Sequence, residues 1–281
     1  MKKTTLLISL IFSAFSAQAA ERIISAGSSV TELIYALGAR DQLVAADSTS
    51  RAYVANDDIP LVGYHRQLSP EGLLALEPSV LIGSDEMGPD TTLSVLKNSE
   101  VDVVVTSSGD DIEDLYARID KVAKITNTED KAEQIKTKAK KDIDRLNSQK
   151  LASSPSVMFL LINSGRPMSV AGSETSIDKI IELAGGNNPA HKQFSSYKAI
   201  SVESILEMKP EYLLIAQRTW DAMGGKEGVL EKYPLLMETP AGHNGRIIPV
   251  PGTALIGGFG LESIKLSGTL NKRFSEEFSA N

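Results

Sequence analysis

The 281-residue sequence contains no cysteine, and this absence excludes several kinds of chemistry. Disulfide bonds, thiolate metal sites and a cysteine nucleophile are ruled out, as is the lipid-modified cysteine that anchors many exported bacterial proteins. Aromatic residues are scarce, at 5%, and only three histidines and one tryptophan occur. Stability must therefore come from packing, and a functional site can draw on few aromatic or imidazole groups.

Long apolar runs are also missing. The N-terminal run over residues 5–15 is too short to span a bilayer, and no later stretch is long enough. This run follows Lys2 and Lys3 and precedes Ala17-Gln18-Ala19, an order typical of a cleaved secretory signal over residues 1–19. An exported protein without a lipid anchor is retained by an outer membrane. We therefore expect a periplasmic protein without stable membrane insertion.

Basic residues are fewer than acidic ones, which gives a formal net charge of -7. An acidic balance argues against nucleic acid as a partner and against adhesion to an anionic membrane surface. The chain beyond the signal, about 260 residues, can bury a core large enough for one big domain or two lobes.

Motifs typical of enzymes do not occur. The chain has no Gly-x-Ser-x-Gly elbow, no His-Glu-x-x-His and no phosphate-binding glycine pattern. The cluster Gly257-Gly258-Phe259-Gly260 fits a tight turn better than a phosphate cradle. We expect a binding protein and not an enzyme, with a periplasmic hydrolase as a remote alternative.

Short apolar runs alternate with helical patterns, which predicts an α/β fold. Continuous apolarity indicates strands covered on both faces. The expected strands are Arg22 to Ala26, Ser79 to Ile82, Val101 to Val105, Val157 to Ile162, Tyr212 to Ala216 and Ile247 to Val250. Helices are expected after caps at Ser28-Ser29, Ser69, Ser176 and Ser201.

The chain also resembles itself. "LSPEGLLALEPSVLIGS" from Leu68 aligns without a gap with "ISVESILEMKPEYLLIA" from Ile200, and "SSVTELIYALG" from Ser28 matches "TSIDKIIELAG" from Thr175. Two pairs in the same order predict two similar α/β lobes with a ligand cleft between them. We place the lobes at residues 20–127 and 151–281.

Residues 128–150 connect the two lobes. The segment is polar almost all round, with a thin apolar stripe whose spacing near 3.5 residues predicts one long amphipathic helix. A single stiff connector of this kind limits hinge motion between the lobes.

These features together resemble the class of periplasmic binding proteins that serves cobalamin, siderophore and haem importers. Within that class, "VGYHRQLSPEGLLALEPSVLIGS" from Val62, "ETPAGHNGRIIPV" from Glu238 and "GTALIGGFGLES" from Gly252 look like the haem-binding branch. The resemblance covers essentially the whole mature chain. It implies haem as the carried ligand and the permease dimer of an ABC importer as the partner.

The resemblance implies that Tyr64 is the axial ligand of the haem iron. A phenolate is a hard oxygen donor suited to Fe(III), and tyrosine serves as an axial ligand in some haem proteins. Arg66 is expected to hydrogen-bond the phenolate or to hold a haem propionate. His65 should point elsewhere in an extended segment, so its replacement should have little effect, although a ligand swap between Tyr64 and His65 stays open.

Some haem-binding relatives supply a second-lobe histidine as the sixth ligand, just after the first strand of that lobe. The corresponding stretch here, residues 161–168, contains none. The iron is therefore expected to be five-coordinate through Tyr64, unless Met168, His191 or water fills the sixth position.

Further candidates lie in the second lobe and on the docking helices. Arg218, Trp220 and Met223 follow a strand, where they suit a cleft wall against the porphyrin, although Trp220 is equally suited to cap the core. Glu71 and Glu203 occupy equivalent places in the repeats, and the resemblance implies that both dock on the permease.

Two other ligands within the same class remain open. A cobalamin site needs an aromatic-lined apolar cleft, and sites for anionic ferric siderophores need several convergent basic residues. The low aromatic content speaks against a cobalamin cage.

Overall fold

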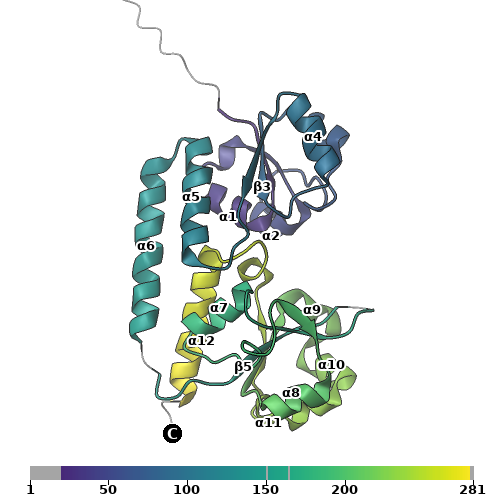
Figure 1. Ribbon diagram of the computed structural model, residues 1–281, viewed down its shortest axis with the longest axis vertical. Coiled ribbons are helices and arrows are strands. Elements are labelled where there is room, and N and C mark those ends of the chain that lie inside the picture. Colours follow the sequence, from purple (N-terminus) through teal and green to yellow (C-terminus); the bar gives the residue numbers. More distant parts are fainter. Residues whose placement is uncertain (1–19, 150, 164, 279–281) are drawn as a thin grey trace, which may run out of the picture.

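The chain forms two α/β lobes stacked along the long axis of the molecule (Figure 1). The structure is a computed structural model that describes residues 20–149, 151–163 and 165–278, so the predicted signal at 1–19 lies outside the described residues. No helix in these ranges has both the length and the apolar character needed to cross a membrane. The predicted fold class, two α/β lobes joined by a long helix, is confirmed.

The first lobe is built on a parallel four-stranded sheet in the order β2-β1-β3-β4. Its strands are β1 Ile23–Ala26, β2 Leu43–Ala46, β3 Val80–Ser84 and β4 Asp102–Thr106. Its helices are α1 Ser28–Ala36, α2 Arg51–Val54, α3 Pro70–Leu74, α4 Asp90–Asn98 and α5 Ile112–Thr126, with 3-10 turns η1 Arg40–Gln42 and η2 Ser48–Ser50. The residues of β1 and β3 are fully buried, as expected for strands covered on both faces.

The second lobe has a mixed five-stranded sheet in the order β7-β6-β5-β8-β9. Strands β5 Val157–Leu161, β8 Tyr212–Ala216 and β9 Ile247–Val250 are parallel, whereas β6 Ser169–Ala171 and β7 Tyr197–Ala199 run antiparallel at one edge. Its helical elements are α7 Ser176–Leu183, α8 Val202–Met208, α9 Gln217–Met223, α10 Gly225–Lys232, η3 Pro234–Glu238, α11 Pro240–His243 and η4 Gly252–Ala254.

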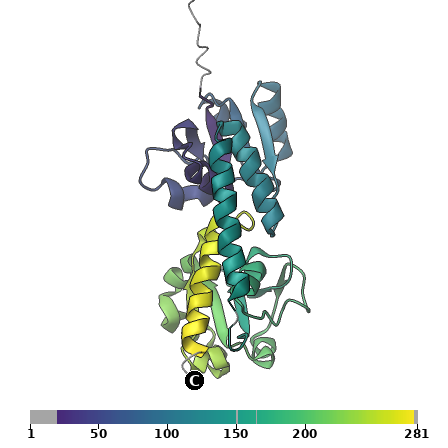
Figure 2. The same ribbon diagram turned by 90° about the vertical axis from the view of Figure 1, so that its left-hand side faces the viewer.

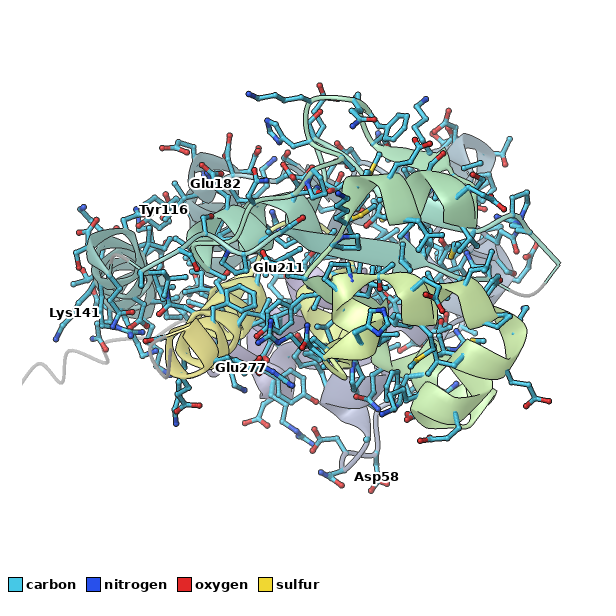
Figure 3. All side chains as sticks on the ribbon, turned by 90° about the horizontal axis from the view of Figure 1, so that it is seen from below. Asp58, Tyr116, Lys141, Glu182, Glu211 and Glu277 are labelled. Carbon is cyan, nitrogen blue, oxygen red and sulfur yellow. The ribbon has the colours of Figure 1, made fainter. Side chains whose placement is uncertain are left out.

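Two long helices join the lobes along one side of the molecule. The predicted connector is observed as α6 Glu129–Ser148, and its apolar stripe is buried at Ala132, Ala139 and Leu146. The C-terminal helix α12 Leu261–Phe278 packs beside α6 and α7 (Figure 2). Seen from below, α6 with Lys141 lies at the outer edge, and α12 with Glu277 lies between α6 and the rest of the second lobe (Figure 3).

The structure corrects two of the four predicted helix caps. Ser69 and Ser201 do cap α3 and α8, since their hydroxyls accept hydrogen bonds from backbone N–H groups of the first turn. In α1 the N-cap is Gly27, and Ser28 lies inside the helix. In α7 the cap is Thr175, and Ser176 is the first helical residue. In α7 the adjacent hydroxyl residues Thr175 and Ser176 are both suitable caps, so the local sequence did not distinguish them, whereas in α1 the cap is a glycine.

The internal repeat extends to the backbone conformation. Glu77 and Lys209, at equivalent places before Pro78 and Pro210, both have φ of +48°. Lys209 is the C-cap of α8, Glu77 lies three residues after the end of α3, and each leads through a proline into an inner strand of its sheet. The matched left-handed residues support the predicted similarity of the two lobes.

Candidate ligand-binding site

The carboxyl edges of both sheets meet at the junction of the lobes. Ser28, directly after the end of β1, donates its hydroxyl to the carbonyl of Ile256 at 3.0 Å. Gly109, after β4, accepts a hydrogen bond from the Phe259 N–H at 3.0 Å. Asp110 accepts one from the Ser176 hydroxyl at 2.7 Å. Ligands of α/β proteins bind outside the carboxyl ends of strands, so this junction is where a site is expected.

The segment after β9 belongs to the second lobe by sequence but lies against the first. Arg118 of α5 is almost fully buried and donates to the carbonyl of Gly257 at 3.1 Å. Gly257 and Gly258 have φ of +87° and +93°, and a Cβ at Gly258 would lie 2.6 Å from the Ser108 carbonyl oxygen. The glycine cluster therefore forms the tight turn that the sequence predicts, at a place without room for a side chain.

Tyr64 lies on the loop between α2 and α3, with 42% of its surface exposed. The chain reaches it through Gly63, whose φ of +93° favours glycine. Ser48 N–H donates to the Gly63 carbonyl at 2.6 Å, which ties the loop to η2. Within the described part of the chain, the Tyr64 hydroxyl has no hydrogen-bond partner, so it is available to a ligand.

His65 differs from Tyr64 in being buried, with 4% of the residue exposed, and its Nδ1 lies 3.0 Å from a carboxylate oxygen of Asp47. The segment is a turn and not extended, since the Gln67 N–H donates to the Tyr64 carbonyl at 2.8 Å. The two side chains therefore do not diverge as expected for an extended segment, and their rings touch edge to face, with centroids 4.5 Å apart.

Arg66 forms an ion pair with Glu86, a residue that the sequence analysis did not single out. The hydrogen bond from Arg66 to Glu86 raises the pKa of the guanidinium. Glu86 follows directly after β3 and Asp85, at the same carboxyl edge as the other junction residues. That position after a buried strand is the signal that would have found it. A contact between Arg66 and the Tyr64 oxygen stays a prediction.

The second-lobe candidates lie on α9, which follows β8 without a loop. Arg218 is exposed, and it makes no hydrogen bond or ion pair with the described residues. Trp220 and Met223 are half-buried against the second-lobe core. In Figure 1, α2 at the lower end of the first lobe faces α9 at the upper end of the second. A contact of these side chains with a ligand stays a prediction.

The residues considered for a sixth iron ligand are engaged elsewhere. Met168 is buried in the second-lobe core. His191 is exposed, and its Nδ1 lies 2.7 Å from the Asp178 carboxylate. Met168 is therefore not available to a ligand without rearrangement, whereas the Nε2 of His191 has no hydrogen-bond partner among the described residues.

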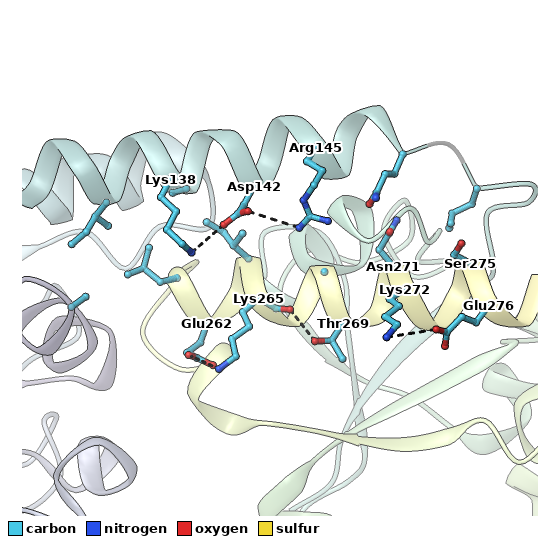
Figure 4. Close-up of a pocket in the computed structure, with 18 residues that line it drawn as sticks. Lys138, Asp142, Arg145, Glu262, Lys265, Thr269, Asn271, Lys272, Ser275 and Glu276 are labelled. Carbon is cyan, nitrogen blue, oxygen red and sulfur yellow. Dashed lines mark hydrogen bonds and ion pairs between the residues drawn. The ribbon is translucent and has the colours of Figure 1, made fainter.

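A large groove lies on another side of the molecule, between α6 and α12, with a volume of about 1190 Å³ (Figure 4). Its charged side chains pair within each helix, as in Lys138 with Asp142 at 3.3 Å and Lys272 with Glu276 at 3.7 Å. None of the candidate site residues lines it. The groove is thus separate from the Tyr64 loop, and its charges are already compensated.

Two α/β lobes with facing carboxyl edges and a helical connector define a two-lobed ligand-binding protein. The chain belongs to the periplasmic binding protein family, whose model matches residues 23–254. The predicted class of protein is thereby confirmed, and it is a family of binding proteins.

Individual relatives refine this placement. The chain is similar to the structure of the periplasmic haem-binding protein HutB of Vibrio cholerae, with 45% identity over 90% of this chain and 98% of that chain and a TM-score of 0.84. A periplasmic haem-binding protein from Pseudomonas aeruginosa is 32% identical, with 92% and 94% covered and a TM-score of 0.85. A vitamin B12-binding protein of Yersinia pestis is 26% identical over 211 residues, which are 75% of this chain and 74% of that protein.

Proposed function

We propose that this protein binds ferric haem in the periplasm and delivers it to the permease dimer of an ABC importer. The observation that carries the proposal is Tyr64, an exposed tyrosine whose hydroxyl has no partner among the described residues, on a loop bonded to η2 after the carboxyl end of β2. The 45% identity to a periplasmic haem-binding protein supports the same ligand for this chain.

The chemistry of Tyr64 matches ferric haem. Fe(III) favours hard, anionic oxygen donors, and a phenolate supplies one without a second charged group. We infer that, when haem binds, the Arg66 guanidinium gives up part or all of its ion pair with Glu86. It then donates a hydrogen bond to the Tyr64 phenolate or to a haem propionate. Arg218, Trp220 and Met223 on α9 are proposed to contact the porphyrin from the second lobe.

Titration with hemin tests the proposal directly. The wild-type protein should develop the Soret and charge-transfer bands of five-coordinate ferric haem bound to tyrosinate. Tyr64→Phe keeps the ring and removes the oxygen, so it should shift these bands and lower the affinity strongly without changing the fold. Tyr116→Phe removes a hydroxyl that contacts the Lys136 carbonyl of α6, so this variant should bind as the wild type does. A Tyr64→Phe protein with an unchanged spectrum and affinity would refute the assignment.

Cobalamin is the second candidate, because the vitamin B12-binding relative covers most of the chain. The lower identity of 26%, against 45% for the haem-binding relative, favours haem. Titration with cyanocobalamin under the same conditions should give no saturable binding, and saturation with cobalamin but not hemin would reverse the choice.

We further propose that Glu71 and Glu203 dock on the permease. Each is the second residue of a serine-capped helix and is exposed. In each case a hydrogen bond from its own backbone N–H, and then one from the capping serine, lowers the pKa of the carboxyl group. Both lobes thus present an ionised carboxylate in the same local setting, which suits positive residues on two similar permease subunits.

Charge reversal tests the docking role. Glu71→Lys combined with Glu203→Lys should abolish haem transport in cells and leave the hemin affinity of the purified protein unchanged. The matched control, Glu100→Lys with Glu231→Lys, reverses exposed carboxylates elsewhere and should transport normally. Unchanged transport in the first double variant would exclude docking through these residues.

A further inference from the structure

Asp47 is a buried carboxylate on which several elements of the first lobe converge. Its side chain accepts hydrogen bonds from the Gly27 N–H at 3.2 Å, the Thr49 hydroxyl at 2.8 Å and the Ser50 hydroxyl at 2.8 Å. The fourth partner is His65 Nδ1, at 3.0 Å. Burial alone would raise the pKa of Asp47, but the bonds from His65, Ser50 and Thr49 outweigh it and the pKa is lowered. The carboxylate is therefore anionic and held from several sides.

His65 continues this arrangement toward the ligand loop. Since an ionised carboxylate only accepts, Nδ1 donates to Asp47. The other ring nitrogen, Nε2, lies 3.7 Å from a carboxylate oxygen of Glu86, whose second oxygen binds Arg66. We call Asp47, His65, Glu86 and Arg66 the anchor chain. It connects the buried end of β2 to the exposed rim of the proposed site.

Tyr64 lies directly against the anchor chain. The edge-to-face contact with the His65 ring restricts the rotation of the phenol, and Gly63 is bonded to η2 on the other side. The carbonyl of His65 also accepts a hydrogen bond from the Gly88 N–H at 2.9 Å, so the backbone is fixed behind Tyr64 as well. The exposed Tyr64 side chain is thus held in place by hydrogen-bonded residues, of which His65 is buried.

We propose that His65, held by Asp47, is a positioning residue that orients the Tyr64 phenolate toward the iron and couples Arg66 to the same support. This inference rests on the proposed function, since it assumes that Tyr64 binds ferric haem. The sequence analysis predicted that replacing His65 would have little effect on haem binding, and the positioning role predicts a loss of affinity instead. Burial and the bond to Asp47, neither of which the sequence displays, are the reason.

The decisive variant is His65→Asn. The asparagine amide can still donate to Asp47 from near the position of Nδ1, but the ring under Tyr64 and the approach to Glu86 are lost. Groups that orient metal ligands typically contribute 10–100-fold in affinity, so the hemin dissociation constant should rise about tenfold. The charge-transfer band should broaden and the high-spin EPR signal should become heterogeneous, because the phenolate no longer has one orientation.

Ser50→Ala is the matched control. It removes a bond to Oδ1 of the same Asp47 carboxylate, whereas His65 binds Oδ2. It should lower the melting temperature and leave both the hemin affinity and the spectra unchanged. His65→Gln is a second variant should His65→Asn fail to fold, because it also removes the ring that touches Tyr64, with its amide near the position of Nε2.

The outcomes separate this inference from the proposed function. If Tyr64→Phe loses haem while His65→Asn and His65→Gln keep the wild-type affinity and spectra, the positioning role is wrong and the haem function stands. If Ser50→Ala alters the spectra as much as His65→Asn does, the role of His65 is only structural and the inference is overturned. If Tyr64→Phe is unchanged, the proposed function itself fails.

Discussion

Glu32 is a buried carboxyl group of the first lobe that caps the C-terminal helix. It is 7% exposed on α1, and it accepts hydrogen bonds from the N–H groups of Leu261 at 3.1 Å and Glu262 at 2.7 Å, in the first turn of α12. Burial raises the pKa of Glu32 from an ordinary value of 4.5 to about 7, against the lowering effect of these two hydrogen bonds. The group therefore titrates near neutral pH in the folded protein.

The sign of the resulting pH dependence follows from linkage. Between the ordinary pKa and about 7, the folded protein holds a proton that the unfolded chain has released. The stability linked to this proton is fully present below about pH 4.5 and is lost as the pH rises through about 7. One pKa unit corresponds to about 1.4 kcal/mol, so the shift amounts to about 3 kcal/mol of unfolding free energy.

Urea unfolding of the wild type and Glu32→Gln at pH 5 and pH 8 measures this effect. Glutamine does not titrate and still accepts one of the two hydrogen bonds. At pH 5, slightly above the ordinary pKa, part of this stability is already lost, so the wild type should lose about 2.5 kcal/mol relative to Glu32→Gln between the two pH values. Glu231→Gln, at an exposed position, should follow the wild type at both. Equal pH dependence in the wild type and Glu32→Gln would refute the reasoning.

Two further predictions concern the ligand loop and the lobe junction. Arg66→Ala should weaken hemin binding by about tenfold, less than Tyr64→Phe does, because it removes a supporting hydrogen bond and not the iron ligand; an equal or larger loss in the hemin titration would contradict its assigned role. Phe259→Ala should lower the free energy of unfolding, measured in urea, by about 3–5 kcal/mol, because Phe259 is 1% exposed in the core that both lobes share. The control Val95→Ala, at an exposed site, should change it by less than about 0.5 kcal/mol. A small effect at Phe259 would mean that the segment after β9 is not held on the first lobe.

The apolar runs identified six of the nine strands of the described residues. All six expected strands are present. Five of them are largely buried, as continuous apolar runs predict, but β4 is an edge strand that is mostly not buried, which corrects the expectation of cover on both faces for Val101 to Val105. The sequence analysis did not predict β2, β6 and β7. Strands β6 and β7 have three residues each, and β7 is exposed along its length, so neither an apolar run nor an alternation marks them. Their pairing depends on neighbours that are already in place.

The sequence by itself determined the two-lobe α/β plan, the connecting helix and the loop that carries Tyr64. These features rest on patterns that the sequence shows: apolar runs, a polar segment with a thin apolar stripe, the Gly63-Tyr64-His65-Arg66 run and an internal repeat that the structure reproduces at Glu77 and Lys209. Apolar runs and stripes mark the faces that become buried, so they identify strands and helices without knowledge of the tertiary contacts.

Only the tertiary structure decided which polar groups are buried and what they touch. Glu32 bonds to Leu261 across more than two hundred residues of sequence, and Asp47 receives His65 from a different loop. Glutamate and histidine are ordinary surface residues in a sequence, and no local pattern distinguishes the buried ones. Their partners arise when distant segments pack, since a buried polar group must find its hydrogen bonds wherever the fold brings them.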